Sequence, residues 1–508
     1  MTTIRSEAVV VGSGAGGSVM AFRLAAAGMR VNVVERGPWL HPRQMSHDEP
    51  AMIARLYKDG GAQTNVDADM FVLQGDCVGG STVLTNAVCF RMPESVRQSF
   101  AAHGFDLPPG ELANAFDRVE GVIGVAPLPT DVHNPATWRL TDGLRRIGAP
   151  AGGFHKAMQD CIGCGYCNIG CRYGKKLDAA QTWIPMAIAR GANVIPELEV
   201  VRIEHRKGHV VGLVAHERQT GQKVRIVADV YVLAGGAINT PELLLRSGLH
   251  RGRAGKRTSF NAGAIVFGEF PEPLDGWKGD QMCVHSLHDD FVIEQIQNPP
   301  VSLALTLPGF FGDHAARMRR FRHLAALGVL VPTQPTGEVY LGLGHRLVRP
   351  LFDHADIRFR MGPRDMAAFR SGCRTAAAAM LAAGARRVFV PSGTDPVIER
   401  PEDLTRIDAA MRTQTDLMGF GSSHPQGGAC AGSDPRRDVV APDFRVRGLR
   451  NLYVADASLF PHSVKVNPML SIMAVADLAA NRITGTRAQS EVTEGPAFRS
   501  RERLAGRT

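Results

Sequence analysis

The pattern of apolar and polar positions at the start of the chain predicts a βαβ unit over residues 7–36. A short apolar run, Ala8–Val11, is typical of a buried strand, and a helix of small residues is expected over residues 17–27. A second run, Val31–Val34, is β-branched and ends at Glu35. The first strand therefore leads through a glycine-rich turn into a helix and then into a second, parallel strand.

Further apolar runs predict the same kind of unit later in the chain. The pattern predicts a strand, a turn and a strand over residues 193–218. It predicts one further strand over residues 224–234, which is followed by Gly235 and Gly236. A short helix is expected over residues 237–248, with Thr240 as its N-cap.

The alternation of apolar and polar positions changes from about residue 255 to residue 420. Apolar runs at 262–270 and 301–307 predict antiparallel strands of a separate, sheet-based domain, and residues 363–383 predict an amphipathic helix. The chain then returns to a strand at 451–455 and a final apolar helix at 469–483. The whole pattern predicts an α/β protein, with a Rossmann-like parallel sheet beside an α+β substrate domain.

The turn of the first unit carries Gly12, Gly14 and Gly17 in G-x-G-x-x-G spacing. Gly12 would form the tight turn, Gly14 would let the backbone approach a pyrophosphate, and Gly17 would let the helix pack closely on the strand. The pyrophosphate would lie at the helix N-terminus, and Glu35 would accept a hydrogen bond from a ribose hydroxyl. The motif predicts a dinucleotide site and does not distinguish NAD from FAD.

A second glycine-rich loop at residues 75–86 precedes an apolar stretch. It contains Gly79, Gly80 and Ser81, and Ser81 and Thr82 are residues that favour a helix start. A helix N-terminus here would supply further N–H donors to the same cofactor. A purely structural turn is the alternative.

Two stretches near the C-terminus carry candidate reaction chemistry. His424 lies in the glycine-rich loop 421–430, and Asn467 precedes Pro468 at the start of the last helix. Histidine transfers protons near neutral pH, and an asparagine side chain both donates and accepts hydrogen bonds. The pair would hold a substrate hydroxyl while His424 takes its proton. A structural histidine is the alternative.

These motifs, in this order, resemble the glucose-methanol-choline (GMC) oxidoreductases, a flavoprotein family. The resemblance covers nearly the whole chain. It is carried by the first βαβ unit, Gly79-Gly80-Ser81 with Asn86, Gly236-Ala237 with Thr240-Pro241, Asp456-Ala457-Ser458, and the pair His424 and Asn467. Many members have a second histidine where this chain has Asn467, so the resemblance is nearest to the long-chain alcohol oxidase and sterol oxidase-like branch.

The resemblance implies FAD and a role for each of these residues. Glu35 would hold the adenosine ribose, and Asp456 would lie near the ribityl-phosphate region. His424 would be the only base, with Asn467 as its partner, and the hydride would pass from the substrate carbon to the flavin. The further cofactor contacts expected are Gly79, Gly80, Ser81, Asn86, Val201, Gly236, Asn467 and Pro468.

The resemblance also implies a cofactor domain that is assembled from distant segments. The expected ranges are 1–90, 190–254 and 425–486 for the FAD-binding domain, 91–189 for a connecting region, 255–424 for the substrate-binding domain, and 487–508 for a flexible tail.

Four of the nine cysteines form a cluster, Cys161, Cys164, Cys167 and Cys171, in C-x2-C-x2-C-x3-C spacing. This spacing matches a bacterial ferredoxin ligand run, and thiolates between glycines suit an iron–sulfur cluster. Arg172 departs from that pattern, because a proline is expected after the last cysteine. Zinc, disulfides and plain packing of free thiols are the alternatives.

Composition and charge narrow the class of protein further. The 508 residues are 44% hydrophobic and carry a net charge of +9, with no run of about 18 apolar residues and no signal-peptide pattern. We therefore expect a cytoplasmic enzyme with no nucleic-acid partner. The basic charge, dense at 317–323 and 499–507, is interpreted as a solvated surface, with docking of an acidic redox protein or a membrane surface as alternatives.

The expected reaction is FAD-dependent oxidation of an alcohol to an aldehyde or ketone. The substrate domain is rich in Phe, Leu, Ala and Met and poor in Trp and Tyr, which favours a hydrophobic, long-chain or sterol-like alcohol. The cysteine cluster favours a dehydrogenase that passes electrons to a redox protein or quinone. An oxygen-using oxidase, a hydroxynitrile-lyase-like enzyme and a non-catalytic flavin-binding protein are the alternatives.

Overall fold

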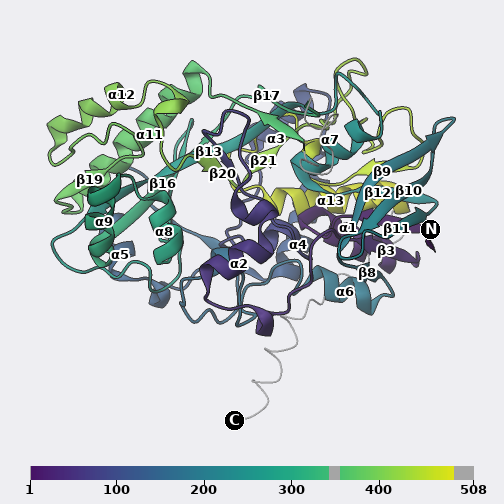
Figure 1. Ribbon diagram of the computed structural model, residues 1–508, viewed down its shortest axis with the longest axis horizontal. Helices are drawn as coiled ribbons and strands as arrows, with labels where there is room; N and C mark the ends of the chain where they lie inside the picture. Colours follow the sequence, from purple (N-terminus) through teal and green to yellow (C-terminus); the bar gives the residue numbers. More distant parts are fainter. Residues whose placement is uncertain (1, 343–354, 486–508) are drawn as a thin grey trace, which may run out of the picture.

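The computed structural model describes residues 2–342 and 355–485 of the chain (Figure 1). The expected tail 487–508, with its basic patch at 499–507, lies outside these residues. Among the described residues, no helix has the length and apolar character needed to span a bilayer.

A five-stranded parallel sheet forms the centre of the right-hand half of the molecule in Figure 1. Its order is β22-β12-β2-β3-β8, and every neighbouring pair is parallel. The strands are β2 (Ala8–Val11), β3 (Val31–Val34), β8 (Asn193–Ile195), β12 (Val230–Leu233) and β22 (Leu452–Val454). Their near-continuous apolar sequences suit a sheet that is covered on both faces. The Rossmann-like α/β fold expected from the sequence is confirmed.

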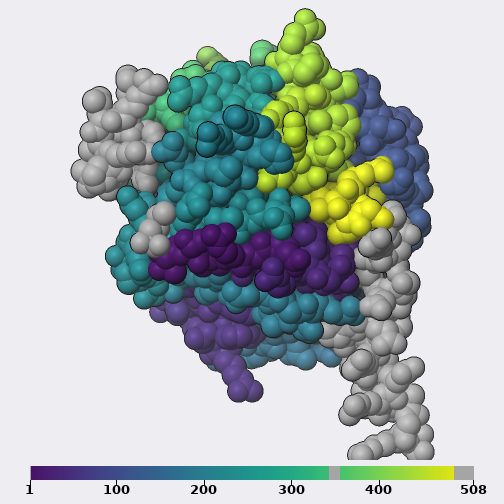
Figure 2. Space-filling view, turned by 90° about the vertical axis from the view of Figure 1, so that its right-hand side faces the viewer, coloured from purple at the N-terminus to yellow at the C-terminus, as the bar shows by residue number. Residues whose placement is uncertain are grey.

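Helices from distant parts of the chain pack around this sheet. Helix α1 (Ala15–Ala26) packs against α6 (Trp183–Ala189) and α13 (Met469–Thr484), and α13 packs against α4 (Pro109–Ile123). The space-filling view shows the same assembly, with purple N-terminal residues between teal residues from the middle of the chain and beside yellow C-terminal ones (Figure 2).

A buried ion pair connects three of these helices. Arg23 of α1 bonds to the Asp477 carboxylate of α13, and both side chains are 1% exposed. The other carboxylate oxygen accepts a 2.5 Å hydrogen bond from Arg118 of α4. Burying a charge is favourable only when its partners remain in place, so this cluster fixes α1 against α13.

A smaller sheet lies beside the parallel one, in the order β1-β11-β10-β9. Its strands are β1 (Thr2–Arg5), β9 (Leu198–Arg206), β10 (His209–Glu217) and β11 (Lys223–Val227). The single strand predicted over 224–234 is wrong: β11 pairs with β10, whereas β12 pairs with β2 in the other sheet. The exposed Asp229 lies at the break, where the chain crosses from one sheet to the other.

The left-hand half of Figure 1 is built on an 11-stranded mixed sheet around the long strand β13 (Lys256–Glu269). The main path is β18-β17-β13-β16-β15-β14-β6, with β16 at Leu324–Pro332, β15 at Val292–Gln295 and β14 at Val284–Leu287. Helix α11 (Pro363–Ala382) packs on β13, β16 and α5 (Pro135–Arg146), close to the helix predicted over 363–383.

The remaining elements are shorter and mostly connect these parts. The helices are α2 (Glu49–Leu56), α3 (Glu94–Ala102), α7 (Gly236–Arg246), α8 (Pro300–Thr306), α9 (Phe311–Arg319) and α12 (Arg406–Ala410). The strands are β4 (Phe71–Val72), β5 (Val125–Pro127), β6 (Gly152–Gly153), β7 (His155–Ala157), β17 (Gly337–Tyr340), β18 (Asp356–Arg358), β19 (Arg387–Phe389), β20 (Gly421–Ser422) and β21 (Pro425–Gln426).

The strand predicted over residues 301–307 is wrong, because this segment forms helix α8. Pro300 stands in the first turn, where a proline fits. The Glu49 carboxylate, on α2, accepts hydrogen bonds from the N–H groups of Val301 at 2.8 Å and Ser302 at 2.9 Å. A helix cap from a residue so distant in sequence has no local signal.

Two predicted helix starts are also wrong. Helix α7 begins at Gly236, so Thr240 and Pro241 lie inside it and Thr240 is not its N-cap. After Gly79, the chain makes only a short 3-10 turn over Gly80–Val83 instead of opening an apolar helix.

Candidate active site

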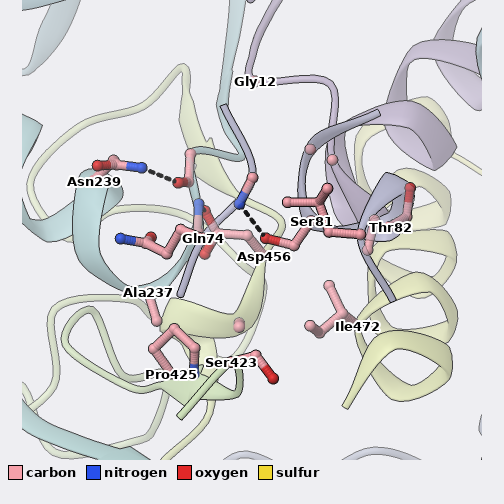
Figure 3. A pocket seen from close by; sticks show the side chains of 18 of the residues that line it. Gly12, Gln74, Ser81, Thr82, Ala237, Asn239, Ser423, Pro425, Asp456 and Ile472 are labelled. Carbon is pink, nitrogen blue, oxygen red and sulfur yellow. Dashed lines mark hydrogen bonds between the residues drawn. The ribbon is translucent and has the colours of Figure 1, made fainter. Parts of the chain in front are cut away.

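One cavity of about 420 Å³ lies between the two halves and is lined by residues from almost every part of the chain. Ligand sites in proteins are usually of this size or larger. One wall comes from the turn after β2, the turn after β12 and the loop 75–86. The loop 75–86 is called here the cofactor loop. The other comes from residues 423–425, 456–457 and 467–469. Figure 3 shows Gly12, Ser81, Ala237 and Asp456 around this cavity.

The turn after β2 has the geometry that a dinucleotide pyrophosphate needs. Gly12 has φ +98°, and a Cβ there would lie 2.4 Å from the carbonyl oxygen of Ala234. Gly14 is the N-cap of the twelve-residue helix α1, with no side-chain cap and no acidic residue in the first turn. The first N–H groups of α1 therefore face the cavity wall without a carboxylate to occupy them, and they suit an anion.

The cofactor loop lies directly against this turn. A Cβ on Gly80 would lie 2.8 Å from the Cα of Gly14, so the two glycine turns are in contact. Gly79 and Gly17 do not line the cavity. The N–H of Gly79 donates to the Ser13 hydroxyl at 3.0 Å, and a Cβ on Gly17 would lie 2.0 Å from the Gly12 carbonyl oxygen. These two glycines shape the turns.

Glu35 lies at the end of β3 and lines the cavity, as expected for a residue that holds a ribose. Its carboxylate accepts hydrogen bonds from the Ser13 N–H at 3.0 Å, the Ser13 hydroxyl at 2.7 Å and the Gly37 N–H at 3.0 Å. Burial raises the pKa of Glu35, and these hydrogen bonds oppose that effect. The contact between Glu35 and a ribose stays a prediction.

Asp456 is held in place by the turn after β12. Its carboxylate accepts hydrogen bonds from the Gly236 N–H at 2.8 Å, the Thr240 hydroxyl at 2.6 Å and the Ser458 N–H at 2.8 Å. The Thr240 side chain therefore orients Asp456 instead of capping a helix.

Val201, expected as a cofactor contact, is not among the lining residues. The cavity is lined by Leu198, Glu199 and Val200 at the start of β9. Successive side chains of a strand point to opposite faces. The predicted contact was therefore one position away from Val200, the residue of this strand that lines the cavity. Ser81, Asn86, Gly236, Asn467 and Pro468 do line the cavity.

The cavity is also lined by three polar side chains, those of His424, Asn467 and Glu294. Glu294 is buried, and the other two are half-buried. The Nδ1 atom of His424, the Oδ1 atom of Asn467 and the Oε1 atom of Glu294 are buried and have no hydrogen-bond partner among the described residues. Unpaired buried polar atoms are costly. Grouped on one cavity, they indicate a site for a polar group of a ligand.

The environment changes the protonation of two of these groups. Burial lowers the pKa of His424 to about 4, so near neutral pH its imidazole is in the neutral form and one ring nitrogen can accept a hydrogen bond. Burial raises the pKa of Glu294 to about 7, and a hydrogen bond with the Asn467 side chain opposes this effect. Glu294 was missed by the sequence analysis, although a lone acid in the apolar run 291–296 was a usable signal.

Asn261 of β13 connects the loops that carry His424 and Asn467. Its side-chain amide donates to the carbonyl oxygen of Val466 at 2.7 Å, and its N–H donates to the carbonyl oxygen of His424 at 3.4 Å. Its own carbonyl oxygen accepts from the Ser422 hydroxyl at 2.6 Å. Asn261 is 1% exposed. This residue was also missed, because its role depends on long-range pairing.

The four clustered cysteines line a second, smaller cavity together with Asp280 and Lys176. Residues 161–171 are called here the cysteine loop. The N–H of Gly163 donates to the Cys161 sulfur at 3.4 Å, and the N–H of Lys175 donates to the Cys171 sulfur at 3.3 Å. All four thiols are free. Within residues 2–342 and 355–485, no three His, Cys, Asp or Glu side chains are grouped closely enough to hold a metal ion.

The fold and the cavity together define a dinucleotide-binding oxidoreductase. The glycine turn suits a pyrophosphate, the carboxylate of Glu35 suits a ribose hydroxyl, and the cavity extends from there to a neutral histidine. These observations fit FAD as the bound group.

Comparison with known proteins identifies the family. Family models of the GMC oxidoreductases match residues 53–262 and 333–476, and a model of an NAD(P)-binding Rossmann-like domain matches residues 10–45. An uncharacterised GMC-type oxidoreductase of Mycobacterium tuberculosis is 32% identical over 95% of this chain and 77% of its own. The chain belongs to the GMC oxidoreductase family and is an FAD-dependent oxidoreductase.

Other relatives have named activities. A long-chain-alcohol oxidase of Arabidopsis thaliana is 28% identical, over 94% of this chain and 67% of its own. A cholesterol oxidase of Mycobacterium tuberculosis is 27% identical, over 94% of this chain and 90% of its own. The solved structure of pyridoxine 4-oxidase from Mesorbium loti has a TM-score of 0.71 at 18% identity, covering 95% of this chain and 99% of that chain. That likeness supports the fold.

Proposed function

We propose that this enzyme oxidises a hydrophobic alcohol, long-chain or sterol-like, to an aldehyde or ketone. The observation that carries the proposal is the state of His424, a half-buried side chain on the cavity. Its Nδ1 atom has no partner among the described residues, and its pKa of about 4 leaves the ring neutral. A neutral imidazole has a lone pair that can accept the hydrogen bond, and then the proton, of a substrate hydroxyl. When bound, FAD supplies the acceptor for the hydride that leaves the substrate carbon.

The other polar groups orient the substrate oxygen. The Asn467 side chain can donate a hydrogen bond to the developing alkoxide while its backbone stays fixed through Val466 and Asn261. Glu294, when protonated, adds a second possible donor beside Asn467. His424 is the base in this scheme, because neither an asparagine side chain nor a protonated carboxyl group can accept the proton.

The lining of the cavity near these groups supports an apolar substrate. The lining residues that carry large apolar side chains in this region are Leu73, Val88, Met282, Ile296 and Leu330. An apolar pocket with a few convergent polar groups is typical of a site for a hydrophobic small molecule. The named activities of the Arabidopsis and mycobacterial relatives support the same substrate class.

The cysteine loop is proposed as the site of an iron–sulfur cluster that would pass single electrons to a redox protein or quinone. Four thiols on one cavity and backbone N–H donors to the sulfurs support this assignment. The four cysteine sulfurs would have to move closer to one another to bind the cluster. Iron analysis after anaerobic purification tests it, and a flavin spectrum without iron contradicts it. Molecular oxygen is the alternative electron acceptor. The cytoplasmic location of the enzyme stays a prediction.

The test of the main proposal is anaerobic mixing with a panel of alcohols while the flavin absorption is followed. Hydrophobic alcohols should bleach the flavin of the natural enzyme. The His424→Ala variant should retain FAD and lose bleaching, whereas His323→Ala, outside the cavity, should behave as the natural enzyme. Bleaching that survives in His424→Ala would overturn the role of His424. A hydroxynitrile-lyase-like enzyme would turn over its substrate with no bleaching.

A further inference from the structure

The buried ammonium of Lys176 lies between the cysteine loop and the cofactor loop. Its Nζ donates to the carbonyl oxygens of Val83 at 2.5 Å, Thr85 at 2.8 Å and Cys167 at 2.7 Å. An ammonium has three N–H donors, so these three carbonyl groups use all of them. Lys176 is 1% exposed. One side chain therefore fixes the backbone of both loops.

Additional contacts join the same two loops and the FAD cavity. The Tyr57 hydroxyl donates to the carbonyl oxygen of Asn168 at 2.6 Å, and both residues line the FAD cavity. On the apolar side, Ile169 of the cysteine loop belongs to the same buried cluster as Val83 and Leu84 of the cofactor loop. The residues that follow Cys167 are thus packed directly against the wall of the cofactor site.

The charge of Lys176 has no carboxylate directly bonded to it among the described residues. The nearby Asp178 instead accepts hydrogen bonds from the N–H groups of Ala180 at 3.0 Å and Gln181 at 3.2 Å. A buried cation that is held only by carbonyl groups is expensive to maintain. Its position favours negative charge at the thiols of the cysteine cavity, which Lys176 also lines.

We propose that Lys176 is a positioning residue that couples the cysteine loop to the bound flavin. A change at the thiols, whether metal binding or chemical modification, would move the Cys167 carbonyl group and, through the shared ammonium, the carbonyl groups of Val83 and Thr85. Since the cofactor loop lines the FAD cavity, the flavin would report the change. The coupling rests on the FAD site and does not require that the metal be iron.

Energetic coupling between two sites is measured by a double-mutant cycle. The variants are Cys164→Ser, Lys176→Met and the double variant, all as FAD-loaded enzyme. The measurements are the visible circular dichroism and the midpoint potential of the flavin. We expect Cys164→Ser to shift both in the natural background and to shift neither in the Lys176→Met background. Equal shifts in both backgrounds would overturn the proposal.

A second measurement avoids the stability cost of Lys176→Met, which leaves the carbonyl groups of Val83 and Thr85 without the donor they have in the natural enzyme. Iodoacetamide added to the natural enzyme alkylates the partly exposed thiols of Cys161, Cys164 and Cys171. The flavin dichroism should change in step with alkylation, and an unchanged signal after complete alkylation would contradict coupling. In Lys176→Arg, which keeps the cation, the response should be retained.

The control variant is Lys223→Met, at the start of β11 and outside both cavities. The Lys223 side chain is exposed, so its removal should leave the flavin signals and their response to alkylation unchanged. Failure of the alcohol panel to bleach the flavin would contradict the proposed reaction alone. The dichroism and potential measurements need no substrate, and they decide the coupling separately.

Discussion

The side-chain amide of Asn261 donates a 2.7 Å hydrogen bond to the carbonyl oxygen of Val466, the residue directly before Asn467. The same residue is bonded through its backbone N–H to the carbonyl oxygen of His424. One buried residue of the long strand β13 therefore sets the separation of the proposed base and its partner. The loop that carries His424 is flanked only by β20 and β21, which have two residues each.

Replacing Asn261 by alanine should misplace His424 and Asn467 without removing either side chain. The Val466 carbonyl group loses its donor, and a buried unpaired group costs about 1–3 kcal/mol. We expect kcat for the best alcohol to fall about 100-fold, because a small misplacement near the reaction has effects of that size. Rapid-mixing flavin reduction measures the loss. Asn193→Ala, on the edge strand β8, is the control, and a fall below threefold in Asn261→Ala would contradict this role.

Glu294 should make the enzyme less stable above neutral pH. Its pKa in the folded protein is raised by burial to about 7, above its ordinary value of 4.5. The folded state therefore keeps a proton that the unfolded state releases between about pH 4.5 and pH 7, and the stability present below that window is lost as the pH rises through it.

Glu294→Gln tests this pH dependence, because glutamine keeps the shape and cannot ionise. At pH 8 the variant should be more stable than the natural enzyme, by up to about 3 kcal/mol from the size of the shift, and at pH 4.5 the difference should disappear. Urea unfolding at the two pH values measures it. If Glu294→Gln had the same effect at pH 4.5 and pH 8, the carboxyl would not titrate in this window.

The ion pair between Arg23 and Asp477 should be required for stability and not for chemistry. Both side chains are buried, and Asp477 also bonds to Arg118. Asp477→Ala leaves two guanidinium groups without their partner and should cost about 3–5 kcal/mol of unfolding free energy. Denaturant titration measures this cost. The exposed pair Arg482 and Glu111, at 3.5 Å, is the matched control. Its removal should change stability by less than about 1 kcal/mol.

The sequence predicted those parts of the site that rest on short-range patterns. The glycine turn after β2 was predicted from a spacing within a few residues, and His424 and Asn467 from their separate local surroundings and the family resemblance. The structure places this turn and both side chains on one cavity. Glu294 and Asn261 could not be found in this way. Their roles arise from the pairing of β15 and β13 with β16. This pairing brings Glu294 to the cavity and Asn261 to the loops that carry His424 and Asn467.

The errors in secondary structure have the same origin. Helix α8 was predicted as a strand because Glu49, which caps it, lies about 250 residues earlier in the chain. Thr240 was predicted as a helix cap because the sequence alone does not show that its hydroxyl bonds to Asp456. In each case a contact distant in sequence decided between two locally reasonable conformations.

Substitutions at two glycines of the first βαβ unit distinguish the cost of backbone strain from the cost of a steric clash between the new Cβ and a neighbouring strand. Gly12 and Gly28 both have positive φ, +98° and +86°. A Cβ on Gly12 would lie 2.4 Å from the Ala234 carbonyl oxygen, whereas a Cβ on Gly28 would meet nothing within 4 Å. Gly28→Ala should therefore cost only the strain of a left-handed residue, about 1–2 kcal/mol.

Gly12→Ala should in addition push the turn away from β12 and close the approach to the pyrophosphate. We expect FAD to be lost on gel filtration from Gly12→Ala and retained by Gly28→Ala, with flavin absorbance per polypeptide as the measurement. The two strands β2 and β12 carry the turns on either side of this contact, so the damage falls on the cofactor site more than on the core. Equal FAD content in the two variants would show that the contact between Gly12 and Ala234 does not control cofactor binding.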